Sequence, residues 1–432
     1  MRFILLRAMP RHLCALCNVV VLLTTLPLSH AAGLPLTLSE AQRLGAERSR
    51  QLAAQDSSVA AAREMAAAAG QLPDPALKLG IENLPVEGGD AWSLTRDFMT
   101  MRRIGVMQEF TREEKRQLRA ERFNREAERA LAEKSATLAT IQRDTALAWL
   151  DRYYAEAMAA VVAEQIKAAR LEIEAAETAY RGGRGSQADV FSARASVVSF
   201  EDRASEIDRR IRTAKTALAR WIGEAAESPL AGKPDIDTVG LDPRELDTQL
   251  AHHPQIAALA KQVEIASTEA KLAQANKKPD WSMELTYSQR GPAYSNMVSV
   301  GVAIPLQWDQ KNRQDREVAA KLATAEQAEA QREDALRAHV AEVRAMIQEW
   351  ESLRERRARY ERELVPLSAQ RTQAVLAAYR GGKSSLAEVL AARRGEIEVR
   401  TQVLQLESEN ARLWAQISFL VPHPAAQTGA TQ

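Results

Sequence analysis

One pentapeptide occurs twice in this chain, as Ala179-Tyr180-Arg181-Gly182-Gly183 and as Ala378-Tyr379-Arg380-Gly381-Gly382. The two copies are separated by 379 − 180 = 199 residues, and the residues that follow repeat at the same offset: Ser186 with Ser385, and Ala-Asp-Val at 188–190 with Ala-Glu-Val at 387–389. An offset close to half of the 432 residues indicates that the chain contains two copies of one structural unit.

Each pentapeptide ends a long stretch of strong helix formers. Val106 to Arg181 contains no Gly or Pro, and Leu306 to Arg380 is interrupted only by Pro366. At 1.5 Å per residue, roughly 65 helical residues extend about 100 Å, so the sequence predicts rods far longer than an ordinary domain core. The first rod has the seam spacing of a coiled coil at Ala127, Leu131, Leu138, Ile141 and Ala148.

The Gly-Gly pairs predict the end of each rod and a tight turn into a return helix, over 187–222 and 386–420. Shorter helices are expected before each unit, over 39–70 with Ser39 as its N-cap, and over 247–276. A long two-helix hairpin cannot bury its apolar stripe alone. We therefore expect these hairpins to pack sideways against other copies of the same hairpin.

Between the short helix and the rod, the apolar period in each half changes to two, with turns expected at 83–90 and 289–292. In the first half the apolar positions of the two strands are Leu77, Leu79, Ile81, Phe98, Ile104, Val106 and Phe110. In the second half they are Trp281, Met283, Leu285, Tyr287, Val298, Val300, Val302, Ile304 and Leu306. The pattern predicts one β-hairpin per half, over 76–110 and 281–306.

These strands fit two interpretations. One is a small soluble sheet. The other is a membrane barrel, because the strands are close to the roughly 9–11 residues that a tilted spanning strand needs. A barrel in lipid has no unpaired edge, and bacterial barrels have about eight strands or more, so four strands per chain would require a cyclic oligomer.

Residues 1–31 have the pattern of a secretory signal peptide. Three arginines precede the apolar stretch Leu13–Leu28, and Ser29-His30-Ala31 provides small residues at a cleavage site. An N-terminal membrane anchor is the alternative, although the apolar run is short for a span. Both cysteines, Cys14 and Cys17, lie in this segment, so the mature protein is expected to have no thiol, disulfide or lipid anchor.

The composition gives no support to nucleic-acid binding or catalysis. The chain has 58 basic and 57 acidic residues, without the clustered basic excess that nucleic acid requires. It contains no nucleophile elbow and no dense His and carboxylate cluster, and Gly182-Gly183-Arg184-Gly185 lacks the strand and Lys of a phosphate loop. We therefore expect neither enzyme activity nor a cofactor.

The duplicated order of short helix, strand hairpin, long helix, Tyr-Arg-x-Gly turn and return helix resembles the TolC-type outer-membrane efflux channels. The likeness covers essentially the whole mature chain, and the segment 253–256 (His-Pro-Gln-Ile) and Pro366 are similar to further marks of that family. The resemblance implies a homotrimer in the outer membrane of a Gram-negative bacterium. Its expected partners are a periplasmic adaptor (membrane fusion) protein, an RND-type inner-membrane pump and outer-membrane lipid.

The expected fold is therefore mainly α with a small β part. Duplicated coiled-coil hairpins form an α-barrel, and four strands from each of three chains form a 12-stranded outer-membrane β-barrel. The expected organisation is a signal peptide 1–31, a first repeat 32–222 with its tip at 180–186, a linker 223–246, a second repeat 247–421 with its tip at 379–385, and a flexible tail 422–432.

The resemblance also assigns a periplasmic gate and adaptor-docking region to the two turns. Its residues are Tyr180, Gly182, Gly183, Asp189, Tyr379, Gly381, Gly382, Lys383, Ser384 and Glu388. Glu388 matches a position that forms a ring of carboxylates, whereas the family's second acidic position is Ala391 here. Asp189 and Tyr379 match residues that hold neighbouring hairpins closed, with Lys383 in place of an expected arginine. The simpler interpretation of Glu388 and Asp189 is an exposed helix charge.

For the cargo, residues 74–85 and 93–110 resemble the heavy-metal branch of the family, which serves copper, silver, cobalt, zinc or cadmium pumps. Met99, Met101 and Met107 are expected to share a strand face, where thioethers would suit monovalent copper or would simply pack. His252-His253 would bind metal or serve the start of a helix. No complete metal site is expected.

Several alternatives remain open at this point. The conduit would carry drugs or secreted polypeptides in place of metal ions, as in type I secretion. A periplasmic adaptor also has a helical hairpin, but normally one, flanked by β-rich domains. A soluble periplasmic coiled-coil scaffold would explain the rods and leave the period-two strands unexplained.

Overall fold

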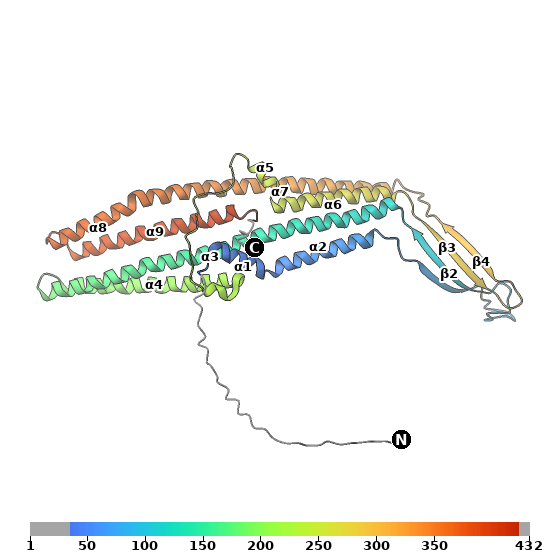
Figure 1. Ribbon diagram of the computed structural model, residues 1–432, viewed down its shortest axis with the longest axis horizontal. Coiled ribbons are helices and arrows are strands. Elements are labelled where there is room, and N and C mark those ends of the chain that lie inside the picture. The colour runs from blue at the N-terminus through green and yellow to red at the C-terminus, as the bar shows by residue number, and fades with distance from the viewer. Residues whose placement is uncertain (1–34, 423–432) are drawn as a thin grey trace, which may run out of the picture.

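The computed structural model describes residues 35–422 and places long helices side by side, with a four-stranded sheet at one end and the two Gly-Gly turns at the other (Figure 1). The expected signal peptide 1–31, and all of the expected tail beyond Pro422, lie outside the described residues. The prediction of a mainly helical chain with a small β part is confirmed.

Nine α-helices and four strands make up most of the described chain. The helices are α1 Leu38–Arg48, α2 Arg50–Ala69, α3 Glu113–Arg181, α4 Gln187–Ile222, α5 Leu246–Ala251, α6 Pro254–Asn276, α7 Gln314–Arg359, α8 Val365–Arg380 and α9 Leu386–Ser418. The strands are β1 Ala76–Glu82, β2 Met101–Phe110, β3 Trp281–Gln289 and β4 Met297–Ala303. A short 3₁₀ helix, Gly223–Glu227, follows α4, and a π-helical turn, Tyr360–Leu364, separates α7 from α8.

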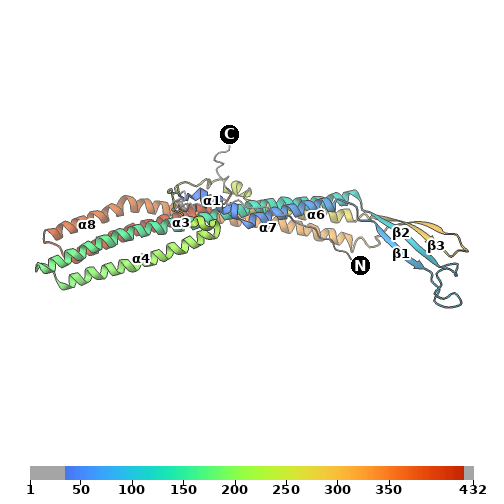
Figure 2. The same cartoon turned by 60° about the horizontal axis from the view of Figure 1, so that its bottom comes forward.

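The helices form a layer whose order changes halfway along the molecule. Toward the sheet, α3 packs between α2 and α6, and α7 packs on α6. Toward the turns, α3 packs between α4 and α9, and α8 packs on α9 (Figures 1 and 2). The long helix α3 therefore extends along the whole layer. Helices α2 and α4 lie one after the other along one side of α3, and α6 and α9 lie one after the other along its other side.

The largest buried side chains lie halfway along the layer, where the neighbours of α3 change from α2 and α6 to α4 and α9. Trp149, Leu150 and Tyr154 of α3 form one cluster with the ends of α4 and α9, and Val343, Ile347 and Trp350 of α7 form a second with α5. The indole Nε1 of Trp149 donates to the carbonyl oxygen of Leu36 at 3.1 Å, and that of Trp350 donates to Ile236 at 3.1 Å. In each copy, the tryptophan of the long helix thus attaches a non-helical segment from earlier in the chain to that helix.

Several helix limits differ from the sequence predictions because local caps interrupt them. Thr37, not Ser39, caps α1, since its hydroxyl accepts from the Glu40 N–H at 3.2 Å. The expected helix 39–70 is broken at Ser49, whose hydroxyl caps α2. The expected helix 247–276 is broken before His253, whose ring caps α6.

The second rod is also discontinuous. It begins at Gln314 and not at Leu306, and it is interrupted at Tyr360–Leu364. Pro366 has no N–H to donate, and its ring would collide with the carbonyl group four residues earlier in a regular helix. The wider π-helical turn avoids this collision. In it, the N–H of Val365 bonds to the carbonyl of Tyr360, five residues back.

The predicted seam of the first rod is correct except at one position. Ala127, Ile141 and Ala148 are buried and Leu138 is half-buried, but Leu131 is 43 % exposed. The physical reason is that α3 has a neighbour on each side and not a single coiled-coil partner. One heptad seam therefore cannot describe all the buried positions of α3.

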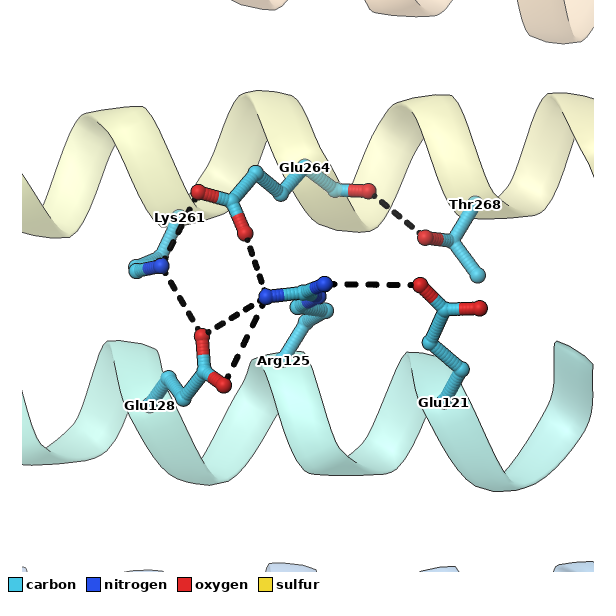
Figure 3. A network of polar contacts seen from close by, with 6 residues as sticks. All are labelled: Glu121, Arg125, Glu128, Lys261, Glu264 and Thr268. Atoms are coloured by element: carbon cyan, nitrogen blue, oxygen red, sulfur yellow. Dashed lines mark hydrogen bonds and ion pairs between the residues drawn. The ribbon is translucent and has the colours of Figure 1, made fainter.

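A network of charges joins the two copies on the sheet side of the molecule (Figure 3). The Arg125 guanidinium of α3 lies 2.9 Å from Glu264 of α6, and the Lys261 ammonium of α6 lies 2.9 Å from Glu128 of α3. The hydrogen bond from Lys261 is the main cause that lowers the pKa of the Glu128 carboxyl. Since these groups are partly exposed, each pair contributes little alone, and the network mainly fixes the register of α3 against α6.

In the described residues, no helix is both long enough and apolar enough to cross a lipid bilayer.

His253 gives the junction of α6 and α7 a testable dependence on pH. Its ring is 4 % exposed, its Nδ1 accepts from the Gln255 N–H at 3.3 Å, and it lies against the His339 ring at 4.4 Å between centroids. Burial, with a smaller contribution from His339, lowers the pKa of His253 to about 4. The stability that neutral His253 contributes is complete above the ordinary histidine pKa of 6.5 and is lost as the pH falls from there toward about 4.

We expect His253→Asn to keep an N-cap acceptor and to remove this titration. The wild-type protein should lose up to about 3 kcal/mol more than the variant between pH 7 and pH 4. Thermal unfolding followed by circular dichroism at the two pH values measures the difference. His252→Asn, at the exposed neighbouring ring, is the control. An equal pH response of wild type and His253→Asn would contradict the assignment.

Candidate functional site

The two Gly-Gly turns have the same backbone structure. In the first, the N–H of Gly183 bonds to the Tyr180 carbonyl at 3.0 Å and that of Arg184 to the Ala179 carbonyl at 2.9 Å. In the second, the N–H groups of Gly382 and Lys383 bond to Tyr379 at 3.0 Å and Ala378 at 2.8 Å. This pair of bonds is a Schellman motif, and it requires the positive φ of 69° that Gly183 and Gly382 both adopt.

The helix that follows the first turn begins with a complete capping box. The hydroxyl of Ser186 accepts from the N–H of Asp189 at 3.2 Å, and the Asp189 carboxylate accepts from the N–H of Ser186 at 2.8 Å. These hydrogen bonds, above all the one from the backbone N–H, hold the pKa of the Asp189 carboxyl below its ordinary value of 3.8. Asp189 therefore stabilises its own turn, and in the described residues no hydrogen bond or ion pair joins it to the second hairpin.

The second turn uses the equivalent residues differently. The hydroxyl of Ser385 accepts from the N–H of Glu388 at 3.3 Å, as in the first copy. The Glu388 carboxylate, however, accepts from the side-chain hydroxyl of Ser384. This carboxylate is exposed, and no cation of the described residues lies within ion-pair distance of it.

The two tyrosines of the repeated motif also lie in different environments. Tyr180 is 49 % exposed. Tyr379 is half-buried and packs against a cluster that joins the two hairpins, formed by Ala176, Val190, Ala193, Leu386 and Leu390. Of the residues assigned from the sequence, Tyr379 is thus the one that bridges the hairpins inside a single chain.

One ion pair between the two hairpins was not predicted from the sequence. The Arg393 Nε of α9 lies 2.8 Å from a carboxylate oxygen of Glu172 on α3, whose side chain is mostly buried. Burial raises the pKa of the Glu172 carboxyl, and the Arg393 guanidinium opposes that shift. The repeat of Arg194 as Arg393 was the only available signal, and it was misleading, because Arg194 pairs with Glu177 inside the first hairpin.

At the opposite end of the molecule, the sheet has the order β1-β2-β3-β4 and is antiparallel throughout. The register aligns Leu79, Ile104, Tyr287 and Val298 in one row, and Leu77, Val106, Leu285 and Val300 in the next. All eight side chains are exposed. One face of the sheet is therefore a continuous apolar surface that no part of the described chain covers.

The other face of the sheet is mostly polar or small, apart from Met101, Met107 and Met297. Lys78 of β1 and Glu284 of β3 form an ion pair at 2.6 Å across Gly105 of β2, and Thr286 and Ser288 point to the same side. The outer strands β1 and β4 each leave one edge without a partner strand among residues 35–422. Side chains that alternate between an apolar and a polar face are typical of a sheet that lies between an apolar and an aqueous environment.

Some strand predictions were wrong at the sheet end. The first turn is not confined to 83–90 but runs from Asn83 to Thr100, so Phe98 and Met99 lie in a loop. Strand β4 ends at Ala303, before Ile304 and Leu306. The long first loop folds over the second turn, and a Cβ at Gly291 would meet the Thr95 carbonyl oxygen at 1.9 Å. Because such a tertiary contact holds the loop, the strand pattern did not reveal its length.

The three methionines therefore do not share a strand face. Met101 and Met107 lie on the polar face of β2, but six residues separate them by about 20 Å, and Met99 is in the loop. His253 caps a helix and His252 is exposed, its Nδ1 3.1 Å from the Thr248 carbonyl oxygen. Over residues 35–422, no group of three or more His, Cys, Asp or Glu side chains is placed to hold a metal ion.

Comparison with known proteins places the fold among outer-membrane channels. Residues 246–421 match the family described as "Outer membrane efflux protein". No curated protein matches the sequence significantly.

Three solved structures illustrate the likeness. The outer membrane protein VceC from Vibrio cholerae is 20 % identical with a TM-score of 0.70, over 89 % of this chain and 95 % of that one. CusC, described in terms of transmembrane channel formation, is 16 % identical with a TM-score of 0.75, over 89 % and 92 %. The open state of the MtrE outer membrane channel of Neisseria gonorrhoeae is 15 % identical with a TM-score of 0.72, over 89 % and 88 %.

The capping box at the first turn is open to a direct test. Asp189→Ala removes the carboxylate that accepts from Ser186, and loss of such a cap costs about 1 kcal/mol. We expect amide hydrogen exchange over residues 186–190 to become about fivefold faster, measured by mass spectrometry. Asp202→Ala, on the same helix and without a partner in the described chain, is the control.

The same cap predicts a dependence on pH. Because the folded pKa of Asp189 is lowered, its contribution is present above the ordinary pKa of 3.8 and is lost as the pH falls through the folded value. Unchanged exchange in Asp189→Ala at neutral pH would show that the carboxylate does not support the turn.

Proposed function

We propose that this chain is the outer-membrane exit channel of a tripartite efflux system and that it acts as a homotrimer. The observation that carries this proposal is the four-stranded sheet with an uncovered apolar face and two unpaired edges. Lipid would cover the apolar face, and closure of the edges requires other copies of the chain. The likeness in fold to outer-membrane channels, and the family match over 246–421, support the same function.

The dimensions of the sheet agree with a barrel in lipid. Strands β2 and β3 contain 10 and 9 residues, within the roughly 9–11 that a tilted spanning strand needs, whereas β1 and β4 are shorter at 7 residues each. In a trimer, three sheets of four strands would form a barrel with the apolar rows outside. The face with Lys78, Glu284, Thr286 and Ser288 would then line a hydrophilic pore.

The helical layer would continue this pore on the periplasmic side. Long helices side by side have the shape of one third of a tube wall, and α3 alone extends about 100 Å over its 69 residues. The turns at the far end would form the entrance, where we place the gate and the docking site for a periplasmic adaptor and an inner-membrane pump. A soluble periplasmic scaffold is less well supported, because it leaves the apolar sheet face uncovered.

Heavy-metal cations are the cargo that we favour, with drugs and secreted polypeptides as alternatives. The support is the resemblance of residues 74–85 and 93–110 to the heavy-metal branch. The separation of Met101 from Met107 argues against a shared copper site on β2. The wall of the proposed channel would therefore act on metal ions through its charge and its shape, without coordinating them.

At the entrance we assign the gate to the segments 180–189 and 379–388. Three copies of Glu388 would form a single ring of carboxylates around the axis, which attracts cations and is strained by mutual repulsion. Lys383 and Ser384 lie beside this ring, and the Ser384 hydroxyl orients the Glu388 carboxylate. Opening would separate the hairpins and would disturb the cluster around Tyr379.

The channel function predicts the behaviour of the exported protein. We expect it in the outer-membrane fraction as a trimer in mild detergent, and we expect the purified trimer to form conducting pores in planar lipid bilayers. A soluble periplasmic monomer or dimer would contradict the channel and would favour the scaffold.

The gate predicts the effect of one substitution. We expect Glu388→Ala to lower the cation selectivity of single pores and to raise the blocking concentration of a trivalent cation by about tenfold, because the ring loses its charge. Glu398→Ala, at an exposed carboxylate further along α9, controls for net charge. Unchanged selectivity and block in Glu388→Ala would remove Glu388 from the gate.

A further inference from the structure

Residues 304–313 join the sheet to the second long helix and are here called the β4–α7 connection (Figure 1). We infer that Trp308 in this connection is an interfacial anchor, which enters the headgroup layer of a zwitterionic phospholipid membrane beside the sheet. The inference rests on the proposed function and deepens it, because it names a lipid contact outside the strands and places the boundary of the membrane on the helix side.

The two copies join sheet and helix differently. In the first copy, only residues 111–112 lie between β2 and α3. In the second copy, residues 304–313 lie between β4 and α7, so this connection is several times longer. The duplicated plan of strand hairpin and long helix does not require the added length. The β4–α7 connection is therefore a feature of the second copy alone.

Two glutamine side chains hold the β4–α7 connection against the end of α6. The Nε2 of Gln307 donates to the Asn276 carbonyl at 3.1 Å, and that of Gln310 donates to the Lys277 carbonyl at 3.3 Å. Both carbonyl groups lie at the C-terminus of α6, where a helix leaves its last carbonyls without partners of its own. Trp308 thus stands on a fixed stretch of backbone between two residues that bond to α6.

Trp308 itself packs against nothing in its own chain. It is 89 % exposed, more than any other large apolar side chain over residues 35–422. In that part of the chain its indole makes no hydrogen bond and no ring contact. Trp281, at the same end of the sheet, instead stacks on Phe110 with 4.3 Å between the ring centroids. Packing within one chain therefore accounts for Trp281 and leaves Trp308 without a role.

The connection continues the apolar face of the sheet. Val298, Val300 and Val302 of β4 are exposed on that face, and Ile304 follows at the same period of two. Pro305 has no N–H to donate, so the strand ladder ends before it. The connection therefore lies where the apolar face stops. In membrane barrels this boundary is rich in Trp and Tyr, because an indole combines an apolar ring with an N–H that can bond to headgroups.

The charges beside Trp308 favour a zwitterionic membrane. Residues 304–317 contain three cationic and three acidic side chains, so the segment has no net charge. Attraction to an anionic lipid surface requires an excess of Lys and Arg. Binding here depends instead on the indole and on its exposed neighbours Ile304 and Leu306, which suits phosphatidylcholine or phosphatidylethanolamine.

A second copy of the chain is the competing occupant, because β4 is an edge strand. A neighbouring strand would pair with that edge in the plane of the sheet. Side chains of the apolar face point out of this plane, and Ile304 continues their direction. Lipid therefore fits the connection better than the neighbouring copy does.

The inference is tested with single-cysteine variants, since both cysteines of the chain lie in the expected signal peptide. Trp308→Cys, Val300→Cys and Leu171→Cys are each labelled with an environment-sensitive fluorophore and reconstituted as trimers in phosphatidylcholine vesicles. Val300, in the apolar rows, reports on the proposed function, and Leu171, 65 % exposed on α3, is the control. Quenching is measured with a nitroxide on the lipid headgroup and with one at the middle of the acyl chain.

We expect the label at 308 to be quenched about twofold or more strongly by the headgroup nitroxide than by the mid-chain one, with the reverse preference at 300 and no quenching at 171. Quenching at 300 without quenching at 308 would reject the anchor and leave the channel in place. No quenching at 300 would reject the lipid-facing sheet itself. Protection of the label at 308 from aqueous iodide and from both nitroxides would assign it to a neighbouring copy.

A second measurement keeps the native side chain, since a fluorophore can itself partition into lipid. The emission of Trp308 is obtained as the difference between wild type and Trp308→Phe, in vesicles with and without bromine near the headgroup end of the acyl chains. We expect bromine to lower this difference about twofold, and added phosphatidylglycerol to leave it unchanged. A difference that bromine does not lower would overturn the anchor, and stronger quenching with phosphatidylglycerol would overturn its zwitterionic character.

Discussion

The indole hydrogen bonds of Trp149 and Trp350 hold together a helical layer that has no ordinary core. Along most of its length each helix touches a neighbour only on its two sides, and full burial of large side chains is concentrated halfway along the molecule. There the segments around Leu36 and Ile236 cross the rods and are fixed by the tryptophans. Without these two crossing segments, the ends of α4 and α9 would not be held in line with α2 and α6.

The arrangement explains why the chemically distinctive parts lie at the two ends. A layer of parallel helices spaces the sheet and the turns about 100 Å apart without a folded domain between them. The middle part of α3 and α6 is held by small residues and by the charged network of Arg125, Glu128, Lys261 and Glu264. This part of the layer is therefore hydrophilic. The continuous exposed apolar surface lies on the sheet, and single exposed apolar side chains such as Leu171 and Val198 occur on the helices.

The two copies have kept the same turn and have diverged around it. The uninterrupted helix α3 corresponds to α7 and α8, which a π-helical turn separates before Pro366. Asp189 closes a capping box, whereas Glu388 turns to Ser384 and remains exposed. Arg194 stabilises its own hairpin, whereas Arg393 reaches the other hairpin at Glu172. The duplication thus supplies one hairpin with a continuous long helix and a second with the π-helical turn, the exposed Glu388 carboxylate and the Arg393 side chain that links the two hairpins.

The sequence by itself determined the duplication, the long helices, the Gly-Gly turns and the amphipathic strands. Each of these features depends on local periodicity or on the left-handed backbone of Gly183 and Gly382. Only the tertiary structure decided which faces are covered. Leu131 is exposed because α3 has two neighbours, and the loop up to Thr100 packs on Gly291, a contact that the strand pattern does not specify. The partners of Trp149, Trp350 and Arg393 are likewise distant in sequence, and no local pattern specifies a contact between residues more than a hundred positions apart.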